Sequence, residues 1–164
     1  MKNVSSPSVL LKKLTYIYLI HYSSHPSNRS TSLLAINSFQ KDLMASNQLI
    51  RALALRVLCS LKVTDILQIQ LLSLKKCVAD TSPYVRKCAA NAIPKLRHFS
   101  NDPLFVQTLL NITVKLLDTD QSTMVLGSAV TAFIELTDDY SLLHGSYRKL
   151  CQLLADMDEW SQVR

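Results

Sequence analysis

The side chains with the greatest chemical potential are four cysteines and four histidines, which could together hold a zinc ion or supply a nucleophile and a base. The cysteines are separated by 18, 11 and 63 residues, with no C-x-x-C pair and no neighbouring pair of histidines. This spacing argues against a zinc site. We therefore predict no metal and four buried, reduced thiols, at Cys59, Cys77, Cys88 and Cys151.

General acid–base catalysis is the next possibility, because acidic residues cluster at 138–139 and 156–159. Both clusters fall at expected helix ends, where carboxylates ordinarily stabilise a following helix N-terminus. The histidines His25, His98 and His144 fit solvated turns, and His21 has no catalytic partner at a suitable spacing. The chain has two glycines and no glycine-rich phosphate loop, so we predict that it is not an enzyme and uses no cofactor.

Basic side chains are distributed unevenly and could bind an acidic partner or an acidic membrane surface. Residues 1–100 hold 14 Lys or Arg and 3 acids, whereas residues 101–164 hold 4 and 9, which gives net charges of +11 and −5. Solvation of outer helix faces would explain the same charges. The candidate interaction residues are these basic side chains and one tryptophan, which are Lys12, Lys13, Arg51, Arg56, Lys75, Lys76, Arg86, Lys87 and Trp160.

These residues are carried by an internal repeat. The stretch SPYVRKCAANAIPKL, residues 82–96, repeats NQLIRALALRVLCSL, residues 47–61, after 35 positions, and a third copy begins at Ser122. The apolar residues of each copy form one wide stripe at helical spacing. An alanine recurs at the same point of each stripe and would let a neighbouring helix approach closely, namely Ala54, Ala89 and Ala129.

Another helical segment precedes each copy, at 31–44, 66–79 and 103–117, so each repeat is a pair of helices. A two-helix unit with a period of 35–40 residues is typical of an α-solenoid. The motifs of tetratricopeptide and ankyrin repeats are absent. We predict an all-α, right-handed α-solenoid of HEAT/armadillo-like hairpins, with a helix at 6–24, repeats at about 31–61, 64–97 and 102–136, and a partial repeat at 146–164.

Several local features qualify this prediction. Arg51 and Arg86 occupy equivalent positions, where they could bind a partner or cap neighbouring turns. An acidic residue precedes Arg86 but not Arg51, and the third copy has Leu126 instead of arginine, so we expect any Asp–Arg ladder between repeats to be incomplete. Pro94 predicts a kink or an early helix end near Ile93. Neither end of the chain has a polar capping repeat, and we expect a segment of a longer solenoid.

The segments NQLIRALALRVLCSL, SPYVRKCAANAIPKL and KKLTYIYLIHY resemble the N-terminal trunk of beta-adaptins, the large chains of adaptor protein complexes. Within that family, SPYVRK, KLLDTDQSTMVLGSAVTAF and YRKLCQLLADMDEW look most like the beta chains of adaptor complex three. The resemblance spans residues 3–164. The sequence departs from it at Pro94, at the missing acid before Arg51, and at Ser161, where a glycine usually follows the tryptophan.

The resemblance implies a non-enzymatic scaffold, cytoplasmic and peripheral on Golgi, endosomal or vesicle membranes, in vesicle-mediated sorting toward lysosome-related organelles. It implies medium, small and delta-type large chains as partners, together with an Arf-type GTPase and an acidic membrane surface.

Two other functions can be weighed from the residues alone. A HEAT-repeat scaffold of another family, for a phosphatase or for nuclear transport, would share the architecture. Nucleic-acid binding through the basic half is not expected, because the aromatic platforms that stack on bases are scarce among the basic repeats.

Overall fold

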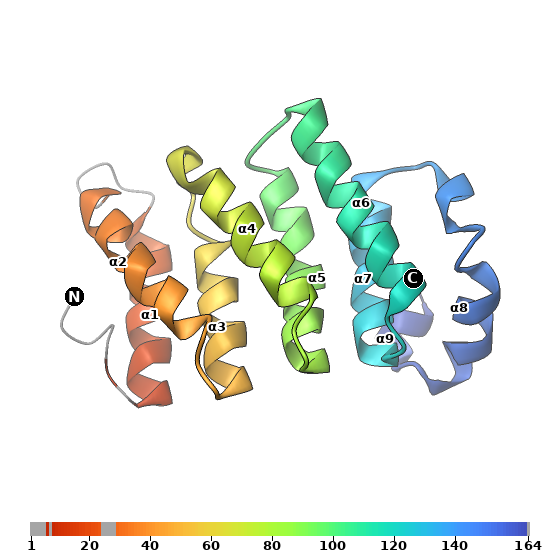
Figure 1. Ribbon diagram of the computed structural model, residues 1–164, viewed down its shortest axis with the longest axis horizontal. Coiled ribbons are helices and arrows are strands. Elements are labelled where there is room, and N and C mark those ends of the chain that lie inside the picture. Colours follow the sequence, from red (N-terminus) through yellow and green to blue (C-terminus); the bar gives the residue numbers. More distant parts are fainter. Residues whose placement is uncertain (1–5, 7, 24–28, 164) are drawn as a thin grey trace.

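The chain is a row of antiparallel helix pairs. The computed structural model describes residues 6, 8–23 and 29–163, and within them the chain forms nine α-helices and no strand (Figure 1). The helices are α1 (Val9–Ser23), α2 (Arg29–Asp42), α3 (Gln48–Leu58), α4 (Leu67–Val78), α5 (Pro83–Arg97), α6 (Pro103–Thr119), α7 (Thr123–Leu136), α8 (Tyr147–Leu153) and α9 (Glu159–Gln162). Of the predicted elements, residues 7 and 24 of the first helix, His25, and Arg164 lie outside the described residues.

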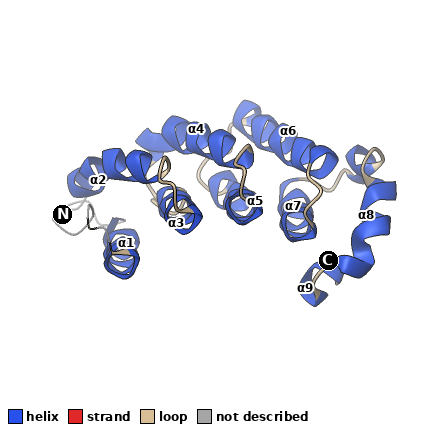
Figure 2. Ribbon diagram, turned by 60° about the horizontal axis from the view of Figure 1, so that its bottom comes forward, coloured by secondary structure: helices blue, strands red, loops and turns tan. Residues whose placement is uncertain are grey.

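The helices form two layers. Helices α2, α4 and α6 make the outer layer and α1, α3, α5 and α7 make the inner layer, which lies on the concave side of an arch (Figure 2). Consecutive hairpins pack side by side in a row (Figure 2). The prediction of an all-α solenoid of HEAT-like hairpins is therefore confirmed.

Close packing in the inner layer depends on the recurring alanines. Ala54, Ala89 and Ala129 are all fully buried, and their small side chains allow α3, α5 and α7 to approach one another. Large side chains such as Leu58, Ile93 and Phe133 fill the space between the two layers and are also fully buried. The apolar stripe read from the sequence is therefore the core.

Polar side chains fix several helix ends. The Asn47 side chain accepts a hydrogen bond from the Leu49 amide at 2.9 Å, and Asp102 caps α6 just before Pro103. Gln70 of α4 is fully buried and donates from Nε2 to the carbonyl oxygens of Leu58 and Leu61, at 2.8 and 3.1 Å. It satisfies carbonyls at the end of α3 and joins the two helices.

Helix α5 does not end early. It runs through Pro94 to Arg97, and the His98 amide donates to the Pro94 carbonyl at 3.3 Å. The expectation of an end near Ile93 was wrong. Ile93 and Leu96, on either side of the proline, are both fully buried, and their packing holds the last turn despite the missing amide donor.

At the C-terminal end, α9 returns to the concave side and packs against α7 (Figure 2). The contact is made at Gly127, where a β-carbon would lie 2.1 Å from the Ser161 Oγ and 2.6 Å from its Cβ. Gly127 is required here by the close approach of Ser161. The serine at the position where the family resemblance has glycine is therefore accommodated by a glycine opposite.

Candidate interaction surface

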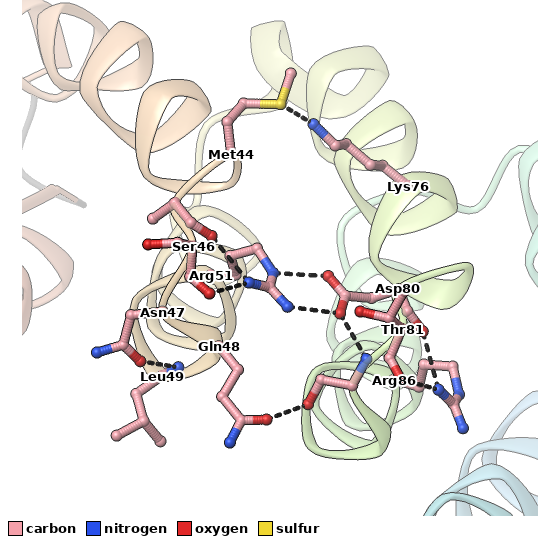
Figure 3. A network of polar contacts seen from close by, with 12 residues as sticks. Met44, Ser46, Asn47, Gln48, Leu49, Arg51, Lys76, Asp80, Thr81 and Arg86 are labelled. Atoms are coloured by element: carbon pink, nitrogen blue, oxygen red, sulfur yellow. Dashed lines mark hydrogen bonds and ion pairs between the residues drawn. The ribbon is translucent and has the colours of Figure 1, made fainter.

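The first repeated cation, Arg51, is held between two repeats. Its Nε and Nη2 donate to the two carboxylate oxygens of Asp80, each at 2.8 Å, and its Nη1 donates to the carbonyls of Ala45 and Ser46 (Figure 3). The planar guanidinium is thus fully committed to one carboxylate and one turn. Arg51 joins the turn of its own hairpin to the next hairpin.

Arg86 repeats this arrangement one unit later. Its Nε and Nη2 donate to Asp120 at 2.5 and 3.1 Å, and its Nη1 donates to the carbonyls of Asp80 and Thr81. Asp80 and Asp120 also accept hydrogen bonds from the amides of Ser82 and Ser122, at 2.8 and 2.9 Å, and so order the residues that start α5 and α7. We call Arg51, Asp80, Arg86 and Asp120 the interrepeat ladder.

The ladder is complete between the three hairpins, and the expectation that it would be broken was wrong. Each arginine pairs with the aspartate of the following repeat, so the acid missing before Arg51 and the arginine missing at Leu126 both fall at the outer ends. At these two ends of the row, other residues make the polar links. Lys12 and Tyr16 of α1 bond Asp42 at one end, and Lys149 donates to the carbonyls of Asp118 and Asp120 at the other.

The electrostatics fit a structural role for the ladder. The hydrogen bond from Arg51 lowers the pKa of Asp80 despite partial burial. Burial would raise the pKa of Asp120, but the hydrogen bonds from Arg86 and the Ser122 amide together bring it below its ordinary value. In Tyr16, burial and the bond to Asp42 raise the phenol pKa. The two aspartates are therefore ionised at neutral pH.

The nine candidate residues do not form one surface. Lys12, Arg51 and Arg86 face carboxylates between helices, with side-chain exposures of 8%, 14% and 19%. Lys75 and Lys76 are exposed on α4 of the outer layer, where the Lys76 ammonium reaches Met44 Sδ, and Lys13 is exposed on α1. Arg56 and Lys87 lie on the inner layer, and Trp160 is 85% exposed on α9.

Two further lysines belong beside these candidates and were missed. Lys115 of α6 and Lys75 of α4 both line an outer groove of about 760 Å³, whose apolar lining includes Val78, Ile112 and Leu116. Lys95 lies with Arg56 and Lys87 in a cleft on the inner layer. Lys95 follows Lys87 by eight residues on one helix, which was the only sequence signal for this grouping.

The whole chain, residues 1–164, matches the family model described as "Adaptin N terminal region". The chain belongs to the adaptin family. It is 49% identical over 164 residues to the AP-3 complex subunit beta of Dictyostelium discoideum and to the human AP-3 complex subunit beta-1. It is 38% identical over 165 residues to the AP-3 complex subunit beta of Saccharomyces cerevisiae. Each alignment covers 99% of this chain.

This adaptin chain spans only part of the length of those relatives, namely 14% of the Dictyostelium and human proteins and 20% of the yeast protein. In the described part of the chain, no helix is both long and apolar enough to cross a bilayer. The likeness is therefore to one stretch of much longer proteins, and it runs through all the helical hairpins.

The thiols of this adaptin are mostly in its core. Cys59, Cys77 and Cys88 are buried, and burial is the main cause that raises the thiol pKa of Cys59 and of Cys77 to about 12. Cys151 is exposed, so the expectation of four buried thiols was wrong for this residue. It lies on the short helix α8, none of whose residues is buried. No group of three or more metal-ligating side chains occurs among the described residues.

Proposed function

We propose that this chain is part of a non-enzymatic scaffold subunit of a type three adaptor complex, in vesicle-mediated protein transport and in cargo sorting from the Golgi and endosomes to lysosome-related organelles. The observation that carries the proposal is 49% identity to beta subunits of AP-3 complexes, continuous over 164 residues. The geometry is consistent with a scaffold, because the recurring polar groups of the repeats bind one repeat to the next.

The proposed partners are the medium, small and delta-type large chains of the same complex. A solenoid offers long exposed helix faces for such partners. Trp160, which is 85% exposed beside Val163 at 88%, is a suitable contact residue, since tryptophan is favoured at the centres of protein interfaces. The protein would be cytoplasmic and peripheral on Golgi, endosomal or vesicle membranes.

Affinity purification of the tagged full-length protein from its own cells tests this assignment. We expect the medium, small and delta-type large chains to copurify in equal amounts. Recovery of phosphatase catalytic subunits or nuclear transport cargo in their place would contradict the proposal and favour the alternative HEAT-repeat families.

We also propose that the exposed cations of the outer layer help the complex to dock on an acidic membrane surface and an Arf-type GTPase. Lys75 and Lys76 on α4 and Lys115 on α6 are the suitable residues, because all three are exposed on the outer layer. Lys75 and Lys115 also line the outer groove. Arg51 and Arg86 are less suitable, since their guanidinium groups already bind carboxylates.

Sedimentation of the complex with acidic liposomes and the GTP-loaded GTPase measures this docking. We expect Lys75→Glu/Lys76→Glu to reduce the bound fraction. Arg56→Glu/Lys95→Glu changes the total charge equally on the inner layer and is the matched control. Equal bound fractions for the wild-type complex, the outer-layer variant and the inner-layer variant would contradict docking through the outer layer.

A further inference from the structure

The inner layer carries a second cationic site, which is separate from the outer groove. A cleft of about 320 Å³ opens between α3 and α5, and all of its lining residues come from these two inner helices. Three of them are cations, Arg56, Lys87 and Lys95, and two more, Tyr84 and Asn91, carry neutral hydrogen-bond donors. Among the residues that the structure describes, no acidic side chain lines the cleft.

Helical spacing explains why these groups converge. Tyr84, Lys87, Asn91 and Lys95 follow one another at intervals of three, four and four residues, and therefore share one face of α5. Arg56 reaches the same face from α3. Cys88 also lines the cleft, and burial raises the pKa of its thiol. Arg56, a hydrogen bond with Tyr84, Lys87 and Lys95 each lower that pKa, as expected where three cations lie near one group.

The cations of this cleft are unpaired, in contrast to those of the ladder. Among the described residues, Arg56 and Lys87 make no ion pair or side-chain hydrogen bond, and Lys95 donates only to the Ser60 hydroxyl at 3.3 Å. The carboxylate of Asp158 at the start of α9 is within electrostatic reach of Lys87. Its pKa is lowered mainly by hydrogen bonds from Ser161 and to a smaller extent by Lys87. Three like charges in one cleft repel, and a bound anion would relieve that repulsion.

We propose that the cleft formed by Arg56, Tyr84, Lys87, Asn91 and Lys95 binds the phosphate group of a phosphorylated peptide segment. A phosphate dianion has three terminal oxygens that can accept from a guanidinium fork, from ammonium groups and from neutral N–H and O–H donors at once. The cleft is close to the lower limit of small-ligand pockets, about 300 Å³, which suits one phosphorylated side chain.

The shape of the arch favours a peptide over a membrane as the source of the phosphate. The cleft is lined by α3 and α5 of the inner layer. This layer lies on the concave side of the arch, towards which α1 and α9 both project from the ends of the row (Figure 2). A flat bilayer would meet these ends first, whereas an extended chain can lie along the inner helices. The site goes beyond the proposed adaptor function and does not depend on it.

The test is a binding titration on the full chain, purified together with its copurifying subunits. The probes are two fluorescein-labelled peptide pools with degenerate flanks, one centred on phosphoserine and the other on serine, and the readout is fluorescence anisotropy at fixed ionic strength. We expect the phosphoserine pool to bind about tenfold more tightly. Inorganic phosphate should displace it, and chloride at the same ionic strength should not.

Two charge-matched variants locate the site. Arg56→Glu/Lys95→Glu should weaken binding of the phosphoserine pool about tenfold or more, while Lys75→Glu/Lys76→Glu on the outer layer should leave it unchanged. Unchanged thermal melting shows that each variant is folded. If the first variant is unfolded, Arg56→Gln/Lys95→Gln is used, with the same expected loss of binding.

Three results would overturn the proposal. The first is equal binding of the two pools, and the second is equal loss of binding in the inner and outer variants. The third is binding of vesicles containing a phosphoinositide that requires Arg56 and Lys95 while the phosphoserine pool fails to bind, because the phosphate would then come from a lipid.

Discussion

Asp120 contributes both to the start of a helix and to the contact between two hairpins. Its side chain is only 3% exposed, yet it is charged, because Arg86 of the preceding repeat and the Ser122 amide of its own repeat both donate to it. A carboxylate in this position would be costly without those donors. The same group therefore helps to start α7 and holds two hairpins together.

Removal of the arginine tests this role. We expect Arg86→Ala to lower the free energy of unfolding by about 2–3 kcal/mol, because it leaves the buried Asp120 carboxylate without its cation. Asp120→Asn alone should also destabilise, and the double variant should lose less than the sum of the two single losses. Urea unfolding of the full chain measures all three.

Arg56→Ala is the control for the loss of an arginine, because its side chain is exposed and makes no ion pair among the described residues. It should change the free energy of unfolding by less than about 0.5 kcal/mol. Additive losses in the double-mutant cycle would show that Arg86 and Asp120 do not act as a pair.

The ladder residues could be predicted from sequence, but their pairing could not. The equivalence of Arg51 and Arg86 follows directly from the repeat. Their acidic partners, Asp80 and Asp120, are 29 and 34 residues further along the chain, a distance set by how consecutive hairpins stack. The expectation of an incomplete ladder came from comparing the acid and the arginine within each copy, whereas each ion pair joins two copies.

At the scale of elements, the short helix α9 depends on a single close approach. The Ser161 side chain occupies the space that a β-carbon at position 127 would need. Only glycine, which has no β-carbon, fits there without a shift. Helix α9 has only four residues and cannot be stable by itself. Its position thus depends on contacts with α7, including the one at Gly127.

We expect Gly127→Ala to detach α9 from α7, even though alanine favours a helix interior by about 1 kcal/mol. The added β-carbon would lie 2.1 Å from the Ser161 hydroxyl, and one of the two must move. Faster amide hydrogen exchange at residues 159–162 would report the detachment.

The double variant Gly127→Ala/Ser161→Gly should restore slow exchange. Without the serine side chain, the nearest atom of that residue to the new β-carbon is its Cα, at an ordinary contact distance of 3.8 Å. If the double variant exchanges as fast as the single one, the clash is not what positions α9.

Long helices were predictable because their apolar stripes are long. Pro83–Arg97 and Pro103–Thr119 show the stripe over several turns, and a proline near the start of each marks where it begins. The short α8 and α9, and the 3-10 turns at Tyr140–Leu143 and Leu154–Asp156, show too few turns for a period to appear. The course of α5 through Pro94 depends on tertiary packing, which sequence propensity does not include.

For the molecule as a whole, the ladder makes stability depend on pH. The pKa values of Asp80 and Asp120 are lower in the folded protein than in an unfolded chain, so their contribution is fully present above about pH 4. It is lost as the pH falls through the lowered values, because protonation then removes the charge that each arginine binds.

We therefore expect similar melting temperatures at pH 7 and pH 5 and a fall below about pH 4. Asp80→Asn/Asp120→Asn should melt at a lower temperature at neutral pH and show a shallower fall in acid. Thermal melts across this range measure both. Parallel curves for the two proteins would assign the acid sensitivity to carboxylates outside the ladder.

All the ladder's ion pairs lie along one border of the arch, where the turns 43–47, 79–82 and 120–122 connect outer to inner helices. At the opposite border, consecutive hairpins are joined by hydrogen bonds such as those from Gln70 to the Leu58 and Leu61 carbonyls, at 2.8 and 3.1 Å, and the 3.3 Å bond from Lys95 to Ser60. The ladder border is thus the one that ion pairs hold together. Because charge-assisted bonds are stronger than neutral ones, we expect the solenoid to bend about the ladder border, with the opposite ends of the helices separating more.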